Sequence, residues 1–244
     1  MRTMTPLTER LEGIEAIVFD LGNTLVPFAE PELKVLYAQL EHAFRAELGP
    51  ETDFYGRANR IRNEMIRERE ADSMREITIE EFCGAVCRRP ASAQLIAAAH
   101  RTMDHTFVEV CRVPEDLGSL LAKLGDRFRL AVLSNYVLTR PVEEVLRRAG
   151  LYEHLHTVEV SATHGYAKPH PDMFERVRSS LGTRPEATLM VGDNFYCDIV
   201  GGHRAGWRTA HTLEHYRGAG SDSRAPDVRA DLVLERLGEL AARP

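Results

Sequence analysis

The sequence has no long apolar run, no excess of basic residues and no closely paired cysteines. No segment approaches the roughly 20 apolar residues that a membrane-spanning helix needs, and residues 1–6 lack the apolar core of a signal peptide. The net charge is −6 with acids and bases interspersed, whereas a nucleic-acid-binding protein normally has a basic face. We therefore expect a protein that works without a membrane or a nucleic acid.

The four cysteines fall in no C-x-x-C pair, so their spacing favours neither a zinc site nor a disulfide framework. Cys83 and Cys87 share one helix face, where buried thiols are expected. Both observations favour a reduced, cytoplasmic protein. With 244 residues, the chain is long enough for one large α/β domain or for a core domain with a smaller insert.

Residues 14–19 form a short apolar run rich in β-branched side chains, which is typical of a strand buried on both faces of a parallel sheet. The run ends at Asp20, and Gly22 and Asn23 then indicate a sharp turn. Ligands of open parallel sheets bind at the carboxyl ends of the strands. Asp20 is therefore either a reactive carboxylate at a strand end or only a turn residue.

The next segment, up to about Arg112, carries almost no strand signal. It predicts four helices: from Pro31 to just before Gly49, over 54–70, from a capping box that opens at Thr78, and over 92–110. After residue 115, helices and strands alternate, which predicts a doubly wound parallel sheet. We expect an α/β core of residues 1–28 and 113–244 with an inserted all-α subdomain of residues 29–112. Strands are expected over 129–133, 156–160, 188–191, 207–212 and 231–234, and helices over 117–124, 141–149, 171–181 and 198–204.

Three of the expected strands end in polar groups: Asp20, the pair Ser134–Asn135, and Asp193, which Asp198 follows closely. Lys168 lies in a loop between the second and the third. Each is ordinary alone, since turns, strand ends and exposed lysines are common. Their joint placement at strand ends points to a site.

Carboxylates that converge at strand ends repel one another unless a cation lies between them. Oxygen ligands of this kind suit Mg²⁺. A cation, a lysine and a hydroxyl together can receive a phosphoryl group, and a carboxylate there can act as the nucleophile through an aspartyl-phosphate. No phosphate-binding or dinucleotide-binding glycine motif is present, so the phosphate is expected to belong to the substrate.

The chain resembles the haloacid dehalogenase (HAD) superfamily, in particular members with a helical cap inserted after the first strand. The resemblance rests on residues 19–25 (FDLGNTL), 133–135 (LSN), 168–169 (KP) and 191–194 (VGDN) with Asp198. It implies a Rossmann-like core, and the cap matches only in position and helical character.

The resemblance also implies roles. Asp20 would be the nucleophile, and Ser134 and Lys168 would contact the phosphoryl group, with Asn135 beside them in substrate binding. Asp20, the Gly22 carbonyl and Asp193 would ligate Mg²⁺. Asp198 would not ligate the metal directly, but would hold a metal-bound water or Lys168.

One position departs from the superfamily pattern. Phosphatases of this superfamily usually carry a second aspartate, the general acid, two residues after the nucleophile, where this chain has Gly22. A positioned acid typically contributes about 10²–10⁴ in rate. We therefore expect a preference for leaving groups that need little protonation. His164 and His170 lie near Lys168 in sequence, but nothing places them at the leaving group.

The expected function is Mg²⁺-dependent hydrolysis of a small phosphorylated metabolite. A dehalogenase, and a weakly active HAD domain with a binding role, are the alternatives. The arginines of the insert alternate with glutamates, which is more typical of a solvated face than of a substrate site. Phe28, just after the nucleophile loop, either lines the pocket or packs at the hinge. The oligomeric state is left open.

Overall fold

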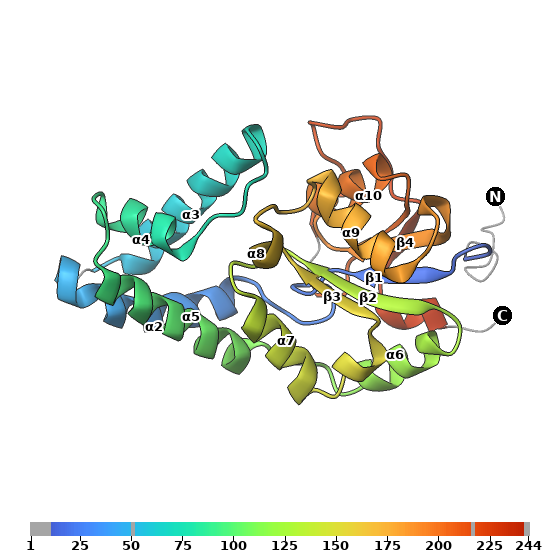
Figure 1. Ribbon diagram of the computed structural model, residues 1–244, viewed down its shortest axis with the longest axis horizontal. Helices are drawn as coiled ribbons and strands as arrows, with labels where there is room; N and C mark the ends of the chain where they lie inside the picture. The colour runs from blue at the N-terminus through green and yellow to red at the C-terminus, as the bar shows by residue number, and fades with distance from the viewer. Residues whose placement is uncertain (1–10, 50–51, 216–217, 242–244) are drawn as a thin grey trace.

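The computed structural model describes residues 11–49, 52–215 and 218–241, and Figure 1 shows their arrangement. They form a six-stranded sheet of order β3-β2-β1-β4-β5-β6, in which all neighbouring strands are parallel. The expected doubly wound parallel sheet is therefore confirmed. The strands are β1 (Ala16–Phe19), β2 (Arg129–Ser134), β3 (Thr157–Val160), β4 (Thr188–Gly192), β5 (Arg208–Thr212) and β6 (Leu232–Leu234).

Strand β1 lies inside the sheet, and all its residues are buried, as its apolar composition predicts. Its last residue, Phe19, pairs with Val132 of β2 and with Val191 of β4. The backbone N–H of Asp20 then donates to the Val191 carbonyl at 2.9 Å. The residues that follow these three strands consequently meet at one edge of the sheet.

Helices cover both faces of the sheet (Figure 1). Alternate residues of β1 face opposite sides of the sheet: Ile17 packs with apolar residues of helices 117–125 and 139–148, and Val18 packs with those of helix 171–181 and with Trp207. The helices of the core are α6 (Leu117–Gly125), α7 (Thr139–Arg148), α8 (Ser161–His164), α9 (Pro171–Leu181) and α10 (Gly201–Arg204), with a π-helical segment η3 (Phe195–Val200) and 3₁₀ turns η1 (Tyr152–His154), η2 (Pro185–Ala187) and η4 (Leu237–Ala241).

The chain between β1 and β2 forms the helices α2 (Glu30–Leu48), α3 (Phe54–Ala71), α4 (Ile79–Cys87) and α5 (Ala93–Val110). These lie together beyond the end of the sheet (Figure 1) and bury a separate apolar cluster, which includes Leu40, Phe44 and Cys83. The expected capping box is present, since the Thr78 hydroxyl accepts from the Glu81 N–H and the Glu81 carboxylate accepts from the Thr78 N–H. We refer to α2–α5 as the cap; its boundaries at 29 and 112 stay a prediction.

One helix begins earlier than expected. The helix predicted over 198–204 starts at Phe195, because Asn194 accepts a hydrogen bond from the Cys197 N–H and caps the segment there. Residues 1–10 and 242–244, which we assign to the core, lie outside the described residues. No helix in the part of the chain that the structure describes is both long and apolar enough to span a bilayer.

Candidate active site

Lys168 is the centre of the polar groups at the sheet edge. Its Nζ donates to Asp20 Oδ1 at 2.6 Å and to the Leu133 carbonyl at 2.7 Å, and lies 2.7 Å from Asp198 Oδ1. The side chain is 1% exposed, so these partners replace water. Burial alone would lower the pKa of Lys168, but the Asp198 and Asp20 carboxylates outweigh it and raise that pKa above its ordinary value. Lys168 is therefore a fixed positive charge beside Asp20.

Asn135 holds the backbone of this lysine. Its Oδ1 accepts from the Lys168 N–H at 2.7 Å, and its Nδ2 donates to the Lys168 carbonyl at 3.0 Å. The side-chain amide thus pairs with the lysine main chain as one strand pairs with another. Asn135 lines the pocket as expected, but its amide is engaged with Lys168, and its role in binding substrate stays a prediction.

Asp20, Asp193 and Asp198 form an acidic cluster in which one carboxylate oxygen from each lies within 4.8 Å of the others. Burial and the neighbouring carboxylates raise the pKa of Asp193 to about 8. Burial also raises the pKa of Asp198 to about 6, against the opposing effect of Lys168. One lysine does not balance three buried carboxylates, so the cluster has the charge and the oxygen donors to hold a divalent cation.

Two features keep Asp198 in place. One is the Asn194 N–H, which donates to Asp198 Oδ2 at 3.0 Å. The other is Gly192, where an added Cβ would lie 2.2 Å from the same oxygen. Behind Asp193, the ring of buried His211 contacts the Asp193 carbonyl through Nε2 at 2.9 Å, and burial lowers the pKa of His211. The sequence does not single out His211, because it lies within β5 and belongs to no recognisable motif.

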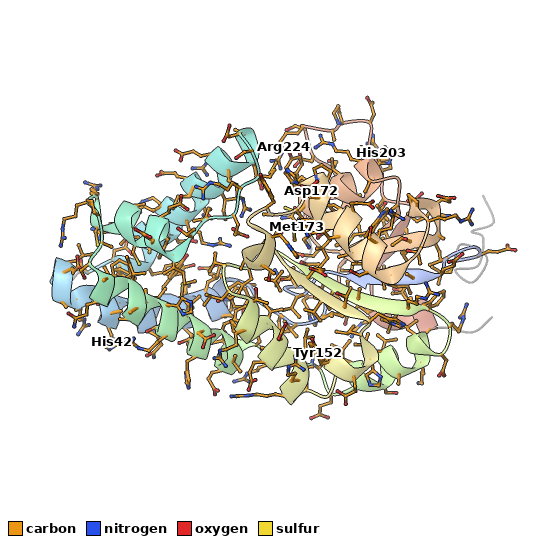
Figure 2. The ribbon with its side chains drawn as sticks, in the orientation of Figure 1. His42, Tyr152, Asp172, Met173, His203 and Arg224 are labelled. Carbon is orange, nitrogen blue, oxygen red and sulfur yellow. The ribbon has the colours of Figure 1, made fainter. Side chains whose placement is uncertain are left out.

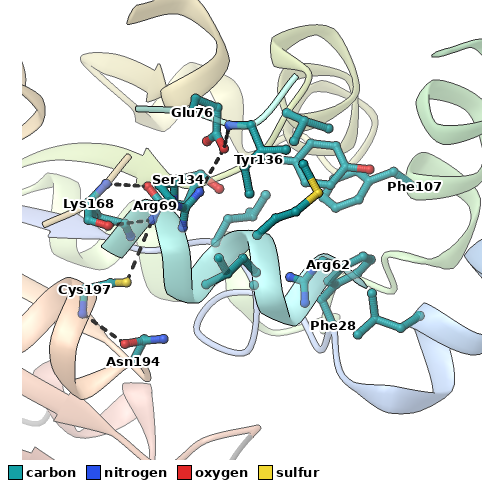
Figure 3. Close-up of a pocket in the computed structure, with 18 of the residues that line it drawn as sticks. Phe28, Arg62, Arg69, Glu76, Phe107, Ser134, Tyr136, Lys168, Asn194 and Cys197 are labelled. Carbon is teal, nitrogen blue, oxygen red and sulfur yellow. Dashed lines mark hydrogen bonds and ion pairs between the residues drawn. The ribbon is translucent and has the colours of Figure 1, made fainter. Parts of the chain in front are cut away.

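A pocket of about 300 Å³ opens over these groups. The core contributes Asp20, Ser134, Lys168 and Asp193, and the cap contributes apolar and aromatic side chains from α2, α3, α4 and α5. Phe28 lies between the two, with its ring 4.9 Å from that of Phe107. Figure 3 shows lining residues of the core, such as Ser134 and Lys168, together with Arg62 and Arg69 of the cap. All the predicted site residues, including Gly22, Asn135 and Asp198, line this pocket.

Two arginines of α3, Arg62 and Arg69, also line the pocket, so the solvated-face interpretation is wrong for both. Arg69 pairs with Glu76 at 2.9 Å, and both side chains are less than 10% exposed. Glu76 Oε1 also accepts from the Ile77 N–H, while its buried Oε2 has no hydrogen-bond partner among the described residues. The sequence pattern could not show which face of α3 would turn toward the core.

The loop between α3 and α4 is bound to the segment that precedes Lys168. The Glu76 N–H donates to the Gly165 carbonyl at 2.7 Å, and the Ala167 N–H donates to the Met74 carbonyl at 2.8 Å. Arg75 and Tyr166 form an antiparallel bridge between these bonds. The backbone of the cap therefore contacts residues 165–167, which together with Lys168 we call the lysine loop.

A second contact joins the cap to the C-terminal loop. Arg224 pairs with Glu70 at the end of α3 and with Asp222 in its own loop. Its guanidinium also lies 3.3 Å from the centre of the Tyr196 ring. Figure 2 shows Arg224 next to the end of α3. The side chain thus links three segments that are far apart in sequence.

The structure does not bring the two histidines considered above into the pocket over Asp20. The His164 ring pairs with Glu159 at 2.5 Å, and the His170 ring caps α9 through the Asp172 N–H. At Gly22, an added Cβ would meet only the Cβ of Phe28, at an ordinary contact distance of 3.6 Å. The structure therefore leaves room for a Cβ at position 22, although glycine has none.

This architecture defines a class: doubly wound α/β proteins with an acidic cluster and a buried lysine at the ends of the central strands, and a helical insert after the first strand. The chain belongs to the haloacid dehalogenase-like hydrolases, whose family model matches residues 14–206. The fold class expected from the sequence and the assignment to this superfamily are thereby confirmed.

Among its relatives, a glyceraldehyde 3-phosphate phosphatase of Methanopyrus kandleri is 26% identical over 231 residues, which cover 93% of this chain and 95% of that protein. The HAD-hydrolase YfnB of Bacillus subtilis, bound to magnesium, matches with a TM-score of 0.69 and 20% identity, over 93% of this chain and 96% of its own. A 2-haloacid dehalogenase of Pseudomonas syringae pv. Tomato matches with a TM-score of 0.67 and 22% identity, over the same shares. The two solved structures show that the fold is shared.

Proposed function

We propose that the protein is a Mg²⁺-dependent phosphatase that hydrolyses a small phosphomonoester through Asp20. The observation that carries the proposal is the arrangement at the sheet edge, where a buried lysine fixes Asp20 beside two further carboxylates. A full-length relative named as a phosphatase supports the same reaction. The pocket of about 300 Å³ suits a small metabolite.

The cation would be held by Asp20 and Asp193, with the Gly22 carbonyl as a third ligand. The raised pKa of Asp193 supports this, because a buried carboxylate between two others needs an added positive charge to stay ionised. When bound, Mg²⁺ supplies charge neutralisation between the nucleophile and the dianionic phosphoryl group. Asp198, held by Lys168 and the Asn194 N–H, would position the lysine and the surrounding polar groups.

In the first step, a carboxylate oxygen of Asp20 forms a bond to phosphorus while the bond to the leaving alcohol breaks. Lys168 keeps Asp20 oriented and offsets the charge of the phosphoryl oxygens, and the Ser134 hydroxyl donates to one of them. The leaving oxygen takes a proton from solvent as it departs, and the attacking water of the second step returns one proton to solvent. In the second step, water attacks the aspartyl-phosphate, releasing phosphate and restoring the Asp20 carboxylate.

Two other functions, dehalogenation and ligand binding, can be distinguished from phosphate hydrolysis by the product that the protein releases. A dehalogenase would release halide from 2-chloropropionate through Asp20 without a metal, and Asp193 would then have no catalytic use. A binding domain would retain ligands without turnover. The cytoplasmic location stays a prediction, supported by the four free thiols.

The test is phosphate release from a broad panel of phosphorylated metabolites and aryl phosphates, measured with Mg²⁺ and with chelator. We expect release by the wild type in Mg²⁺ only, and a loss of at least about 10³-fold in Asp20→Asn, because the nucleophile is removed. The matched control is Asp172→Asn, whose exposed carboxylate lies on α9 away from the pocket. Phosphate release that persists in chelator or in Asp20→Asn would refute the proposal, as would release from no compound.

A further inference from the structure

Arg62 stands apart among the charged residues that line the pocket. Its side chain projects from α3 toward Phe28, at the opposite end of the pocket from Lys168 in the view of Figure 3. Within the part of the chain that the structure describes, its one hydrogen bond is a long contact of 3.4 Å to the neighbouring Asn63, and no carboxylate pairs with it. A half-buried guanidinium turned into a pocket without an anion is an available ligand-binding group.

The other ionised residues of the pocket wall are already paired. Arg69 pairs with Glu76, and Glu70 pairs with Arg224 from the C-terminal loop. The acidic cluster and Lys168 neutralise each other in part, and the cation of the proposed function would complete that balance. Among the residues that the structure describes, no carboxylate therefore pairs with Arg62 at its own end of the pocket.

Tyr136 supplies a second unused donor at the same end. Its hydroxyl oxygen is buried and has no hydrogen-bond partner among the described residues. Burial raises the pKa of Tyr136 well above its ordinary value, against the opposing effect of Arg62, so the hydroxyl keeps its proton. The backbone of Tyr136 is fixed, because its N–H donates to Ser161 Oγ at 2.9 Å, and its ring packs 4.0 Å from that of Phe107. A protonated and unpartnered hydroxyl on a fixed ring, in the same pocket wall as the Arg62 guanidinium, is suited to an oxyanion.

We propose that Arg62 and the Tyr136 hydroxyl bind a second anionic group of the substrate, at the end of the pocket remote from Asp20. This rests on the proposed function and narrows it: the substrate is a small phosphomonoester that also carries a carboxylate or a second phosphate. The apolar walls between the two ends, formed by residues such as Phe28 and Met65, would cover the carbon skeleton that joins the two charges.

The test uses phosphonates, which are not hydrolysed, so that it does not depend on turnover. We would measure the dissociation constants of benzylphosphonate, 3-carboxybenzylphosphonate and 3-(phosphonomethyl)benzylphosphonate by calorimetry in Mg²⁺. The wild type should bind at least one of the two doubly anionic ligands about 10-fold to 100-fold more tightly than benzylphosphonate, as charge-assisted hydrogen bonds would give. Which ligand gains more tells a carboxylate site from a phosphate site.

Arg62→Gln should lower the affinity for the doubly anionic ligands at least 10-fold more than it lowers the affinity for benzylphosphonate, and Tyr136→Phe should reduce the advantage in part. Arg67→Gln, an exposed arginine on the same helix, is the matched control and should keep it. Equal affinities for the three ligands in the wild type, an undiminished advantage in Arg62→Gln, or no measurable binding of either doubly anionic ligand would overturn the inference. Phenyl phosphate hydrolysis, tested with Asp20→Asn, judges the proposed function separately.

Discussion

At the scale of single residues, Gly22 has the most direct consequence for chemistry. The backbone there is not in the left-handed region, and the space that a side chain would enter is limited only by an ordinary contact with Phe28. The Cβ of an aspartate can therefore be added at this position without collision. Its absence leaves the leaving-group oxygen without a dedicated acid in the position where the superfamily usually has one.

We expect Gly22→Asp to raise kcat/KM for alkyl phosphates by up to about 10²-fold and to change aryl phosphates little, because a poor leaving group gains most from protonation. The measurement is kcat/KM against leaving-group pKa for the wild type and the variant, with Gly22→Asn as a matched control that fills the same space without an acid. A flat dependence in the wild type would contradict the prediction. It would indicate a proton from another pocket residue, and Glu76→Gln would then be the variant to examine.

The residues at the strand ends could be predicted from the sequence because each follows an apolar run, and parallel strands bring their ends together. This placed Asp20, Ser134 and Asp193 correctly in one pocket. Arg62 could not be placed in the same way. On a charged helix the alternation of arginine and glutamate is the same for a solvated face and for one that closes over a site, and only tertiary packing separates them.

At the scale of elements, the cap and the core meet through contacts of different kinds. Phe28 and Tyr136 pack against both the cluster of the core and the cluster of the cap. Arg224 adds a polar link between the end of α3, Tyr196 on η3 and its own loop. The existence of the helices was predictable from their 3.6-residue pattern. The contacts made by Phe28, Tyr136 and Arg224 were not, because these three residues lie in loops without a periodic signal.

We expect Arg224→Ala to lower the free energy of unfolding by only about 1 kcal/mol, since its partners are partly solvated. Its main effect should be local: faster amide hydrogen exchange in the last turn of α3, measured by mass spectrometry. Arg184→Ala, which removes an exposed pair with Glu186 in one loop, is the control and should leave α3 unchanged. Unchanged exchange at the end of α3 in Arg224→Ala would show that this contact does not hold the helix.

At the scale of the whole molecule, folding brings the carboxylates of Asp20, Asp193 and Asp198 together before any cation is bound. The pKa of Asp193, about 8, lies above the value near 4 of an unfolded chain, so the folded state binds more protons than the unfolded state between these values. The cation-free protein should therefore lose stability as pH rises through that window. A bound cation removes the need for the proton.

We expect Mg²⁺ to raise the melting temperature, by roughly 2–4 °C for each kcal/mol of binding free energy, with the larger effect at pH 8 than at pH 6. Asp193→Asn should be at least as stable as the wild type in chelator and should respond little to Mg²⁺. Calorimetry of both proteins, with Mg²⁺ and with chelator, each at pH 6 and at pH 8, would check both statements. An equal Mg²⁺ response in the wild type and in Asp193→Asn would show that the cluster is not the cation site.

The backbone contact between the α3–α4 loop and residues 165–167 has a further consequence. The cap cannot separate from the core as a rigid unit without breaking the hydrogen bonds from Glu76 to Gly165 and from Ala167 to Met74, immediately before Lys168 in the chain. Opening of the cap therefore costs the free energy of these two hydrogen bonds, which also help to place the segment before Lys168. By reciprocity, a ligand held by the cap strengthens the placement of Lys168 by as much as the placed lysine strengthens the hold on that ligand. We therefore expect binding of the proposed substrate by the cap and placement of Lys168 to be thermodynamically coupled.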